Sequence, residues 1–144
     1  MLAETLAYFT QGRAGYFINR QGEFPIDITG VDIQGSQTVP MVALVGPGSV
    51  SFGEVFPGIL NDIGRAYLIG ETTDGNVEIL YTHNFSDGSR ALIAEGTFRP
   101  YMNPDQNWEE TGIVPQQIVP SNWDQITIQT DPAIKAALRY FDSR

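Results

Sequence analysis

Residues 41–54 read Met-Val-Ala-Leu-Val-Gly-Pro-Gly-Ser-Val-Ser-Phe-Gly-Glu, and this stretch decides the fold, because an apolar run passes through a glycine-rich turn into an amphipathic segment. The apolar run 41–45 is too short for a helix and is typical of a strand buried on both faces, as in parallel sheets. Apolar side chains then recur at helical spacing from Val55 to Ile63, and Gly64 ends the helix. Residues 66–69 form the next strand, so we predict a right-handed strand-helix-strand unit.

Ser51 stands at the junction between the predicted strand and the predicted helix. A serine at such a turn can act as a nucleophile, because the unpaired backbone N–H groups and the positive end of the helix dipole stabilise a developing oxyanion. Ser51 followed three residues later by Glu54 also fits a capping box, in which each side chain accepts a hydrogen bond from the other residue's backbone. On this motif alone the capping role is favoured, because Ser-x-x-Glu is common.

Four further segments favour the catalytic interpretation of Ser51 over the capping role. They are Asn61-Asp-Ile-Gly-Arg-Ala66, Ile69-Gly-Glu-Thr-Thr-Asp-Gly-Asn76, Phe85-Ser-Asp-Gly-Ser89 and Trp108-Glu-Glu-Thr-Gly-Ile-Val-Pro115. In order and spacing, with Ser51-Phe-Gly-Glu54, they resemble the nucleophile region of the C-terminal processing (tail-specific) serine proteases. The resemblance covers roughly residues 41–141. It implies a ClpP/crotonase-like layered α/β domain and a serine peptidase that cleaves an extended polypeptide by acyl transfer.

The resemblance also assigns roles to individual residues. It makes Ser51 the nucleophile and the backbone N–H of Phe52 one oxyanion donor. The family's usual general base is a lysine at the position of Asn76, and an amide cannot take a proton from a serine hydroxyl. We therefore expect Asn76 to play a supporting, structural role. The remaining nitrogen bases, His83 and Lys135, lie at no family base position.

The absence of that lysine points to the tricorn- and photoreceptor-type branch. Those relatives use a histidine from a segment well upstream of the serine, together with a glutamate that precedes the Gly-Ile-x-Pro segment. The glutamate aligns here with Glu109, although a loop carboxylate beside Glu110 is an equal alternative. Gln116 replaces the family's aspartate after that proline, and the sequence does not explain the change.

Two other residues have competing interpretations. By resemblance Asp62 supports the active site, whereas a contact with Arg65 at the end of the helix is the simpler interpretation. His83 lies in a predicted hairpin, where a surface or packing role is favoured, because a general base must come within about 3 Å of the serine.

The rest of the chain yields a coarse map. We predict a helix over residues 2–9 that ends near Gly12, a strand at 15–19, a hairpin partner at 26–28 after turns, and strands at 77–81 and 90–94 around Asp87-Gly88. Residues 97–99 extend the last of these strands. Asp131 and Pro132 begin a C-terminal helix that carries Ile134, Leu138 and Phe141 on one face. The fold class is thus α/β, with a parallel-strand core, a β-hairpin and a C-terminal helix.

Composition limits the function classes. The 144 residues, 42% hydrophobic and 17% charged, fit a single globular domain over 1–144. The net charge of −9 argues against nucleic acid and anionic membranes as partners. No apolar run is long enough to span a bilayer. The chain has no cysteine, and its acidic residues lack a calcium-loop pattern, so we expect neither metal nor other cofactor.

The family's glycine-rich oxyanion turn has no counterpart before Ser51, and Leu2–Phe9 look like the helix that follows it. We therefore expect the chain to be the C-terminal part of a longer catalytic domain and to be inactive alone, with the base and a peptide-binding domain elsewhere. An oligomer is compatible with the sequence, and the resemblance favours a location outside the cytoplasm. Two rival functions are a non-catalytic peptide-binding module on the same fold and a crotonase-like acyl-thioester enzyme.

Overall fold

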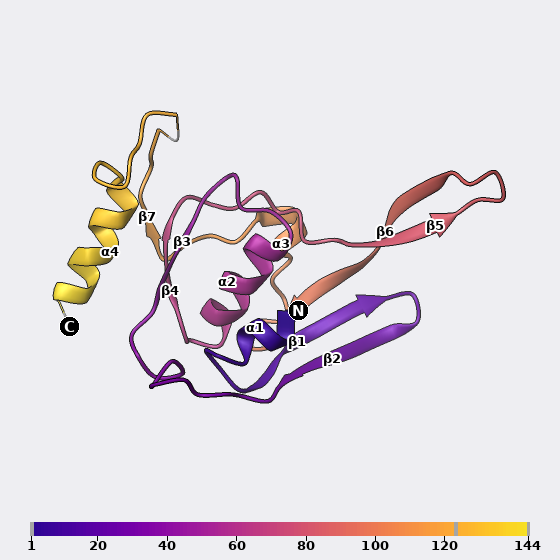
Figure 1. Ribbon diagram of the computed structural model, residues 1–144, viewed down its shortest axis with the longest axis horizontal. Helices are drawn as coiled ribbons and strands as arrows, with labels where there is room; N and C mark the ends of the chain where they lie inside the picture. The colour runs from indigo at the N-terminus through magenta and orange to yellow at the C-terminus, as the bar shows by residue number, and fades with distance from the viewer. Residues whose placement is uncertain (1, 123, 144) are drawn as a thin grey trace.

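Helix α2 (Phe52–Asp62) lies between two β-sheets in the computed structural model, which describes residues 2–122 and 124–143 (Figure 1). It follows the strand β3 (Val42–Val45) and precedes the strand β4 (Tyr67–Gly70). These two strands pair in parallel, from Val42 opposite Tyr67 to Val45 opposite Gly70. The predicted strand-helix-strand unit is therefore confirmed.

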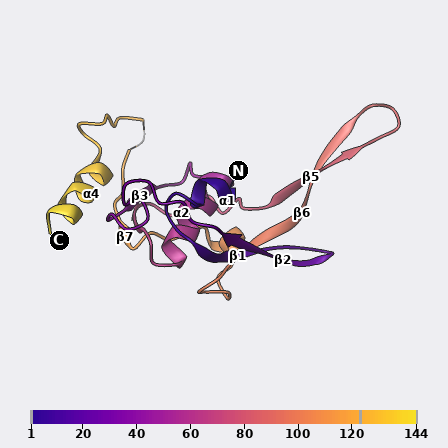
Figure 2. The same cartoon turned by 60° about the horizontal axis from the view of Figure 1, so that its bottom comes forward.

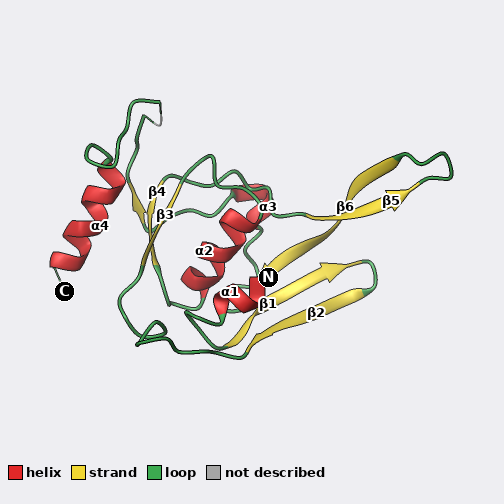
Figure 3. Ribbon diagram, in the orientation of Figure 1, coloured by secondary structure: helices red, strands yellow, loops and turns green. Residues whose placement is uncertain are grey.

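The parallel sheet has the order β3-β4-β7, and its last strand is the short β7 (Gln117–Ile118). Both faces of β4 are buried, because Leu68 packs in the core shared with α2, whereas Ile69 packs with Ala133 and Ala136 of α4 (Pro132–Asp142). The sheet thus separates α2 from α4, as Figure 3 shows. Burial on both sides explains why the strand carries an apolar run without alternation.

The second sheet is antiparallel, with the order β2-β1-β6-β5. Its strands are β1 (Gly12–Asn19), β2 (Gly22–Ile28), β5 (Ile79–Asn84) and β6 (Arg90–Pro100). Residues 96–100 of β6 pair with β1, residues 90–94 pair with β5 alone, and Gly96 pairs with both strands. The outer half of β5 and β6 therefore projects as a two-stranded ribbon, which extends beyond the β1–β2 hairpin in both views (Figures 1 and 2).

The main core is formed by side chains from both sheets and from the helices α1 (Leu2–Leu6), α2 and α3 (Trp108–Thr111). Its buried members include Leu6, Ala14, Ile26, Val45, Val55, Ile59, Leu60, Leu68, Phe98, Trp108 and Ile113. No helix among the described residues has the length and apolarity needed to cross a bilayer.

Several predicted boundaries shift. Helix α1 ends at Leu6 and not near Gly12, because the carbonyl of Ala7 accepts hydrogen bonds from Val31 N–H (2.7 Å) and Gln37 Nε2 (3.0 Å) and so leaves the helical pattern. Strands β1 and β2 are longer than predicted, and β5 begins two residues later. As predicted, residues 97–99 extend the strand that begins at Arg90, because pairing with both β1 and β5 stabilises the whole length of β6.

Helix α4 begins as predicted, with the Asp131 carboxylate accepting from the N–H groups of Ala133 (2.7 Å) and Ile134 (3.3 Å). Its buried face differs from the apolar stripe in the sequence, since Leu138 and Phe141 are exposed. The small Ala133 and Ala136 face the sheet instead, and Tyr140 stacks on Tyr67 with ring centroids 4.5 Å apart. Small side chains allow the helix to approach the sheet closely.

Candidate active site

Ser51 lies where the loop after β3 enters α2, with its side chain exposed. Its backbone has φ 52° and ψ −123°, a region that non-glycine residues rarely adopt and that is associated with functional turns. The loop is held on both sides: Ser49 N–H donates to Gly46 O (2.8 Å), and Asp74 N–H donates to Ser49 O (3.2 Å). The turn therefore presents the Ser51 hydroxyl at a helix N-terminus.

Glu54 is the buried partner of this turn, with 0% of its surface exposed. Its Oε1 accepts hydrogen bonds from Ser51 N–H (3.2 Å) and Asn76 N–H (2.7 Å), and its Oε2 accepts from Gly75 N–H (2.9 Å). Ser51 and Glu54 form the predicted capping box, in which the Glu54 carboxylate accepts from Ser51 N–H. Because Ser51 is exposed, its hydroxyl is available to a substrate.

Some of the backbone N–H groups at the start of α2 donate hydrogen bonds within the fold, and one that follows Ser51 does not do so among the described residues. Ser51 N–H donates to Asn76 O (2.7 Å), and Gly53 N–H donates to Val50 O (2.9 Å). Within the described part of the chain, Phe52 N–H has no hydrogen-bond acceptor. Phe52 N–H, which directly follows Ser51, is thus available to bind an oxyanion.

Asn76 contributes through its backbone. Its N–H and its carbonyl bind Glu54 and Ser51 respectively, while its side chain is exposed. The hydrogen bonds of Asn76 at this turn are thus main-chain contacts, which other residue types can also make.

Glu109 reaches the same region from helix α3. Gly75 lies so close to this helix that an added Cβ would sit 3.0 Å from the Glu109 carbonyl oxygen, and its φ of 88° also favours glycine. The half-buried Glu109 side chain lines a cavity of about 440 Å³ together with Glu78 and Glu95, whereas Glu110 is exposed. The structure thus brings the backbones of Ser51, Asn76 and Glu109 into one neighbourhood.

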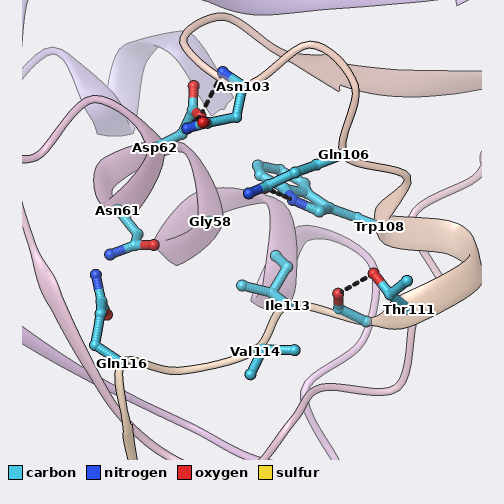
Figure 4. Close-up of a pocket in the computed structure, with 11 residues that line it drawn as sticks. Gly58, Asn61, Asp62, Asn103, Gln106, Trp108, Thr111, Ile113, Val114 and Gln116 are labelled. Carbon is cyan, nitrogen blue, oxygen red and sulfur yellow. Dashed lines mark hydrogen bonds between the residues drawn. The ribbon is translucent and has the colours of Figure 1, made fainter.

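Asp62 lies at the other end of α2, about 16 Å from Ser51 along the helix at 1.5 Å per residue. Its carboxylate accepts from Met102 N–H (2.8 Å), Asn103 N–H (3.1 Å) and Asn103 Nδ2 (2.8 Å), beside a cavity of about 450 Å³ in front of Trp108 (Figure 4).

The predicted contact between Asp62 and Arg65 is wrong. The Arg65 guanidinium donates instead to the carbonyls of Phe9 and Ser36, each at 2.8 Å. Arg65 therefore fixes the N-terminal turn and the loop before β3 to the end of α2, while Asp62 fixes the 102–103 loop.

The two remaining nitrogen bases lie away from the turn. His83 is on the projecting ribbon, where its Nε2 is 2.6 Å from Glu95 Oε1. Lys135 is on α4, on the far side of the parallel sheet (Figure 1). Neither side chain contacts Ser51 in the described residues.

The comparisons with known proteins agree with this geometry. Residues 3–119 match the model of peptidase family S41. The chain belongs to peptidase family S41. A carboxyl-terminal-processing protease of Picosynechococcus sp. is 32% identical over 126 residues, a match that covers 85% of this chain and 30% of that protein.

Two solved structures place this S41 chain by fold. The photosystem II D1 C-terminal processing protease superposes with a TM-score of 0.67 at 22% identity, over 92% of this chain and 36% of that one. The tricorn protease superposes with a TM-score of 0.55 at 18% identity, over 97% of this chain and 13% of that one. The ClpP-like layered fold is therefore confirmed, and the chain spans about a third or less of these proteins.

The sequence does not explain Gln116 and predicts only a helix-capping role for Glu54. Gln116 Oε1 accepts a hydrogen bond from Leu68 N–H (2.7 Å), so its side chain extends the pairing between β4 and β7 by one bond. Glu54 could be found from the Ser-x-x-Glu spacing, but its partners at residues 75–76 are 21 and 22 positions away. No local pattern signals them.

Proposed function

We propose that this chain carries the nucleophile of a serine endopeptidase of the C-terminal processing type, acting on an extended polypeptide. The observation that supports this most directly is the Ser51 turn, which combines an exposed hydroxyl, a strained backbone and an unengaged Phe52 N–H. Membership of family S41 and the named protease relative support the same class. A polypeptide substrate follows from that class.

In the proposed reaction, Ser51 Oγ attacks the carbonyl carbon of the scissile peptide and its proton passes to a general base. The tetrahedral oxyanion is bound by Phe52 N–H, and each such donor contributes about 2.7–4 kcal/mol to transition-state stabilisation. Collapse breaks the C–N bond and the amine leaves with the proton, after which water hydrolyses the acyl-enzyme.

The general base lies outside this chain in our proposal. Asn76 cannot serve, His83 is bound to Glu95 on the projecting ribbon, and Lys135 lies on α4. We assign the protein to the tricorn- and photoreceptor-type branch for this reason, with Glu109 orienting the incoming base and Asp62 supporting the site from the far end of α2. The chain then represents the C-terminal part of a catalytic domain and does not turn over peptides alone.

The test uses the full-length protein and a fluorophosphonate probe, which reacts covalently with an activated serine. We expect one adduct, mapped to Ser51 by peptide mass spectrometry, and loss of both labelling and peptidase activity in Ser51→Ala. Ser49→Ala, two residues away in the same loop, is the matched control and should still be labelled. An adduct on Ser49, or full peptidase activity in Ser51→Ala, would overturn the assignment and favour the non-catalytic module.

A further inference from the structure

The Glu54 carboxylate stands out because it is fully buried and yet, among the described residues, contacts no cationic side chain. Buried charges are normally paired with opposite charges or bind metals. Here three backbone N–H groups, from Ser51, Gly75 and Asn76, satisfy the carboxylate instead. All three belong to the candidate active site, and none of them is in the body of α2.

A helix cap alone does not require this arrangement. A capping glutamate needs only the N–H of the N-cap residue, which here is Ser51. The two shorter contacts, at 2.7 and 2.9 Å, go to a different segment of the chain. That segment returns a hydrogen bond to the turn, since Asn76 O accepts from Ser51 N–H at 2.7 Å. Glu54, Ser51 and Asn76 thus form a closed set of contacts.

We propose that Glu54 is a positioning residue for the nucleophile, an inference that rests on the proposed function of Ser51. By binding the Ser51 N–H and the 75–76 segment together, the carboxylate holds Ser51 at its strained φ of 52° and so fixes the direction of Oγ. The Ser51 N–H is occupied by Asn76 O at 2.7 Å as well as by Glu54, so the oxyanion is left to Phe52 N–H.

The chemistry of the side chain makes the inference testable with a near-isosteric change. Glutamine has the same length as glutamate but only one acceptor oxygen, and its amide group would face an N–H donor at the other position. Glu54→Gln therefore loses either the Gly75 contact or the shared contact to Ser51 and Asn76. Glu54→Asp keeps both oxygens and the charge on a stem one methylene shorter.

The experiment compares full-length wild type, Glu54→Gln and Glu54→Asp by thermal midpoint, by the rate of fluorophosphonate labelling at Ser51 and by kcat and KM for a peptide. We expect Glu54→Gln to fold and to lose about 10²-fold in labelling rate and kcat, as expected for a reacting group displaced by about 1 Å, with KM nearly unchanged. Glu54→Asp should lie between the two. The control is Asp131→Ala, which removes the α4 cap and should lower the thermal midpoint without changing either rate.

The outcomes separate the two claims. If the wild type is not labelled at Ser51, the proposed function fails and this inference fails with it. If the wild type is labelled and folded Glu54→Gln is labelled at the same rate, only the positioning role is refuted. If Glu54→Gln does not fold, Glu54→Asp decides the question. An unchanged labelling rate in Glu54→Asp refutes the positioning role. A slower labelling rate supports that role when the thermal midpoint of Glu54→Asp is no lower than that of Asp131→Ala.

Discussion

Replacing Ser51 by glycine tests whether the turn that carries Ser51 stores strain. Ser51 has φ 52° and ψ −123°, which glycine adopts without a steric penalty but which costs other residues about 1–3 kcal/mol. Against this, glycine gives the unfolded chain extra freedom worth about 0.5–1 kcal/mol relative to alanine. Both substitutions remove the hydroxyl, so its contribution cancels. We expect Ser51→Gly to be more stable than Ser51→Ala by about 1 kcal/mol, the reverse of the usual order.

The measurement is urea denaturation of the 144-residue chain, with thermal unfolding as a second probe, where a difference of about 1 kcal/mol corresponds to about 4 °C. Ser49 supplies the matched control, because it lies in the same loop, has no positive φ, and loses the same Oγ contact to Gly46 N–H in both variants. There glycine should be less stable than alanine by about 0.5–1 kcal/mol. If the Ser51 pair follows the order of the Ser49 pair, the turn is not strained and the reasoning is refuted.

Three further predictions concern separate features. In the full-length protein, Asn76→Ala should keep turnover within about threefold of wild type because only its backbone is used, whereas a drop of about 10²–10⁴ would show acid–base catalysis. Arg99 donates two 2.6 Å hydrogen bonds to the Glu23 carboxylate, and these lower the pKa of Glu23 in the folded protein. The stability that this pair contributes is therefore fully present above the unfolded-state pKa of about 4.3 and is lost as the pH falls through the lowered pKa of the folded state. Urea midpoints measured between about pH 5 and 3 should accordingly fall less in Glu23→Gln, and equal slopes would contradict this. Gly70→Ala should destabilise the chain by about 3 kcal/mol or more, because the added Cβ would lie 1.9 Å from Val45 O. The control Gly48→Ala, where the added Cβ meets no atom within 4 Å, should change stability by less than about 0.5 kcal/mol. A loss of stability in Gly70→Ala as small as that in Gly48→Ala would show that β3 and β4 can separate.

Local patterns in the sequence were sufficient for the central unit. The apolar run 41–45, the helical spacing from Val55 to Ile63 and the glycine at position 64 are each determined by neighbours a few residues away, and the structure agrees with all three. The same holds for the start of α4, where Asp131 binds N–H groups two and three residues ahead. Such contacts form whenever the local conformation forms, so their spacing is visible in the sequence.

The position of Ser51 at the strand-to-helix turn also followed from the sequence, whereas its environment did not. Which N–H groups fill the Glu54 carboxylate, and which one is left for an oxyanion, depends on the packing of residues 75–76 against the start of α2. Helix α3 adds the Glu109 backbone to that neighbourhood only because Gly75 admits it.

Tertiary packing likewise overrode two simple expectations. Asp62 and Arg65 are close in sequence and opposite in charge, yet each binds a distant loop, because the fold brings backbone groups of those loops within reach of the two side chains. On α4 the apolar Leu138 and Phe141 remain exposed, while alanines face the sheet. The sequence by itself determined the local elements and the place of Ser51, the proposed nucleophile, at the turn. Only the tertiary structure decided the partners of the polar groups and the buried face of α4, because these depend on contacts between segments that no local spacing encodes.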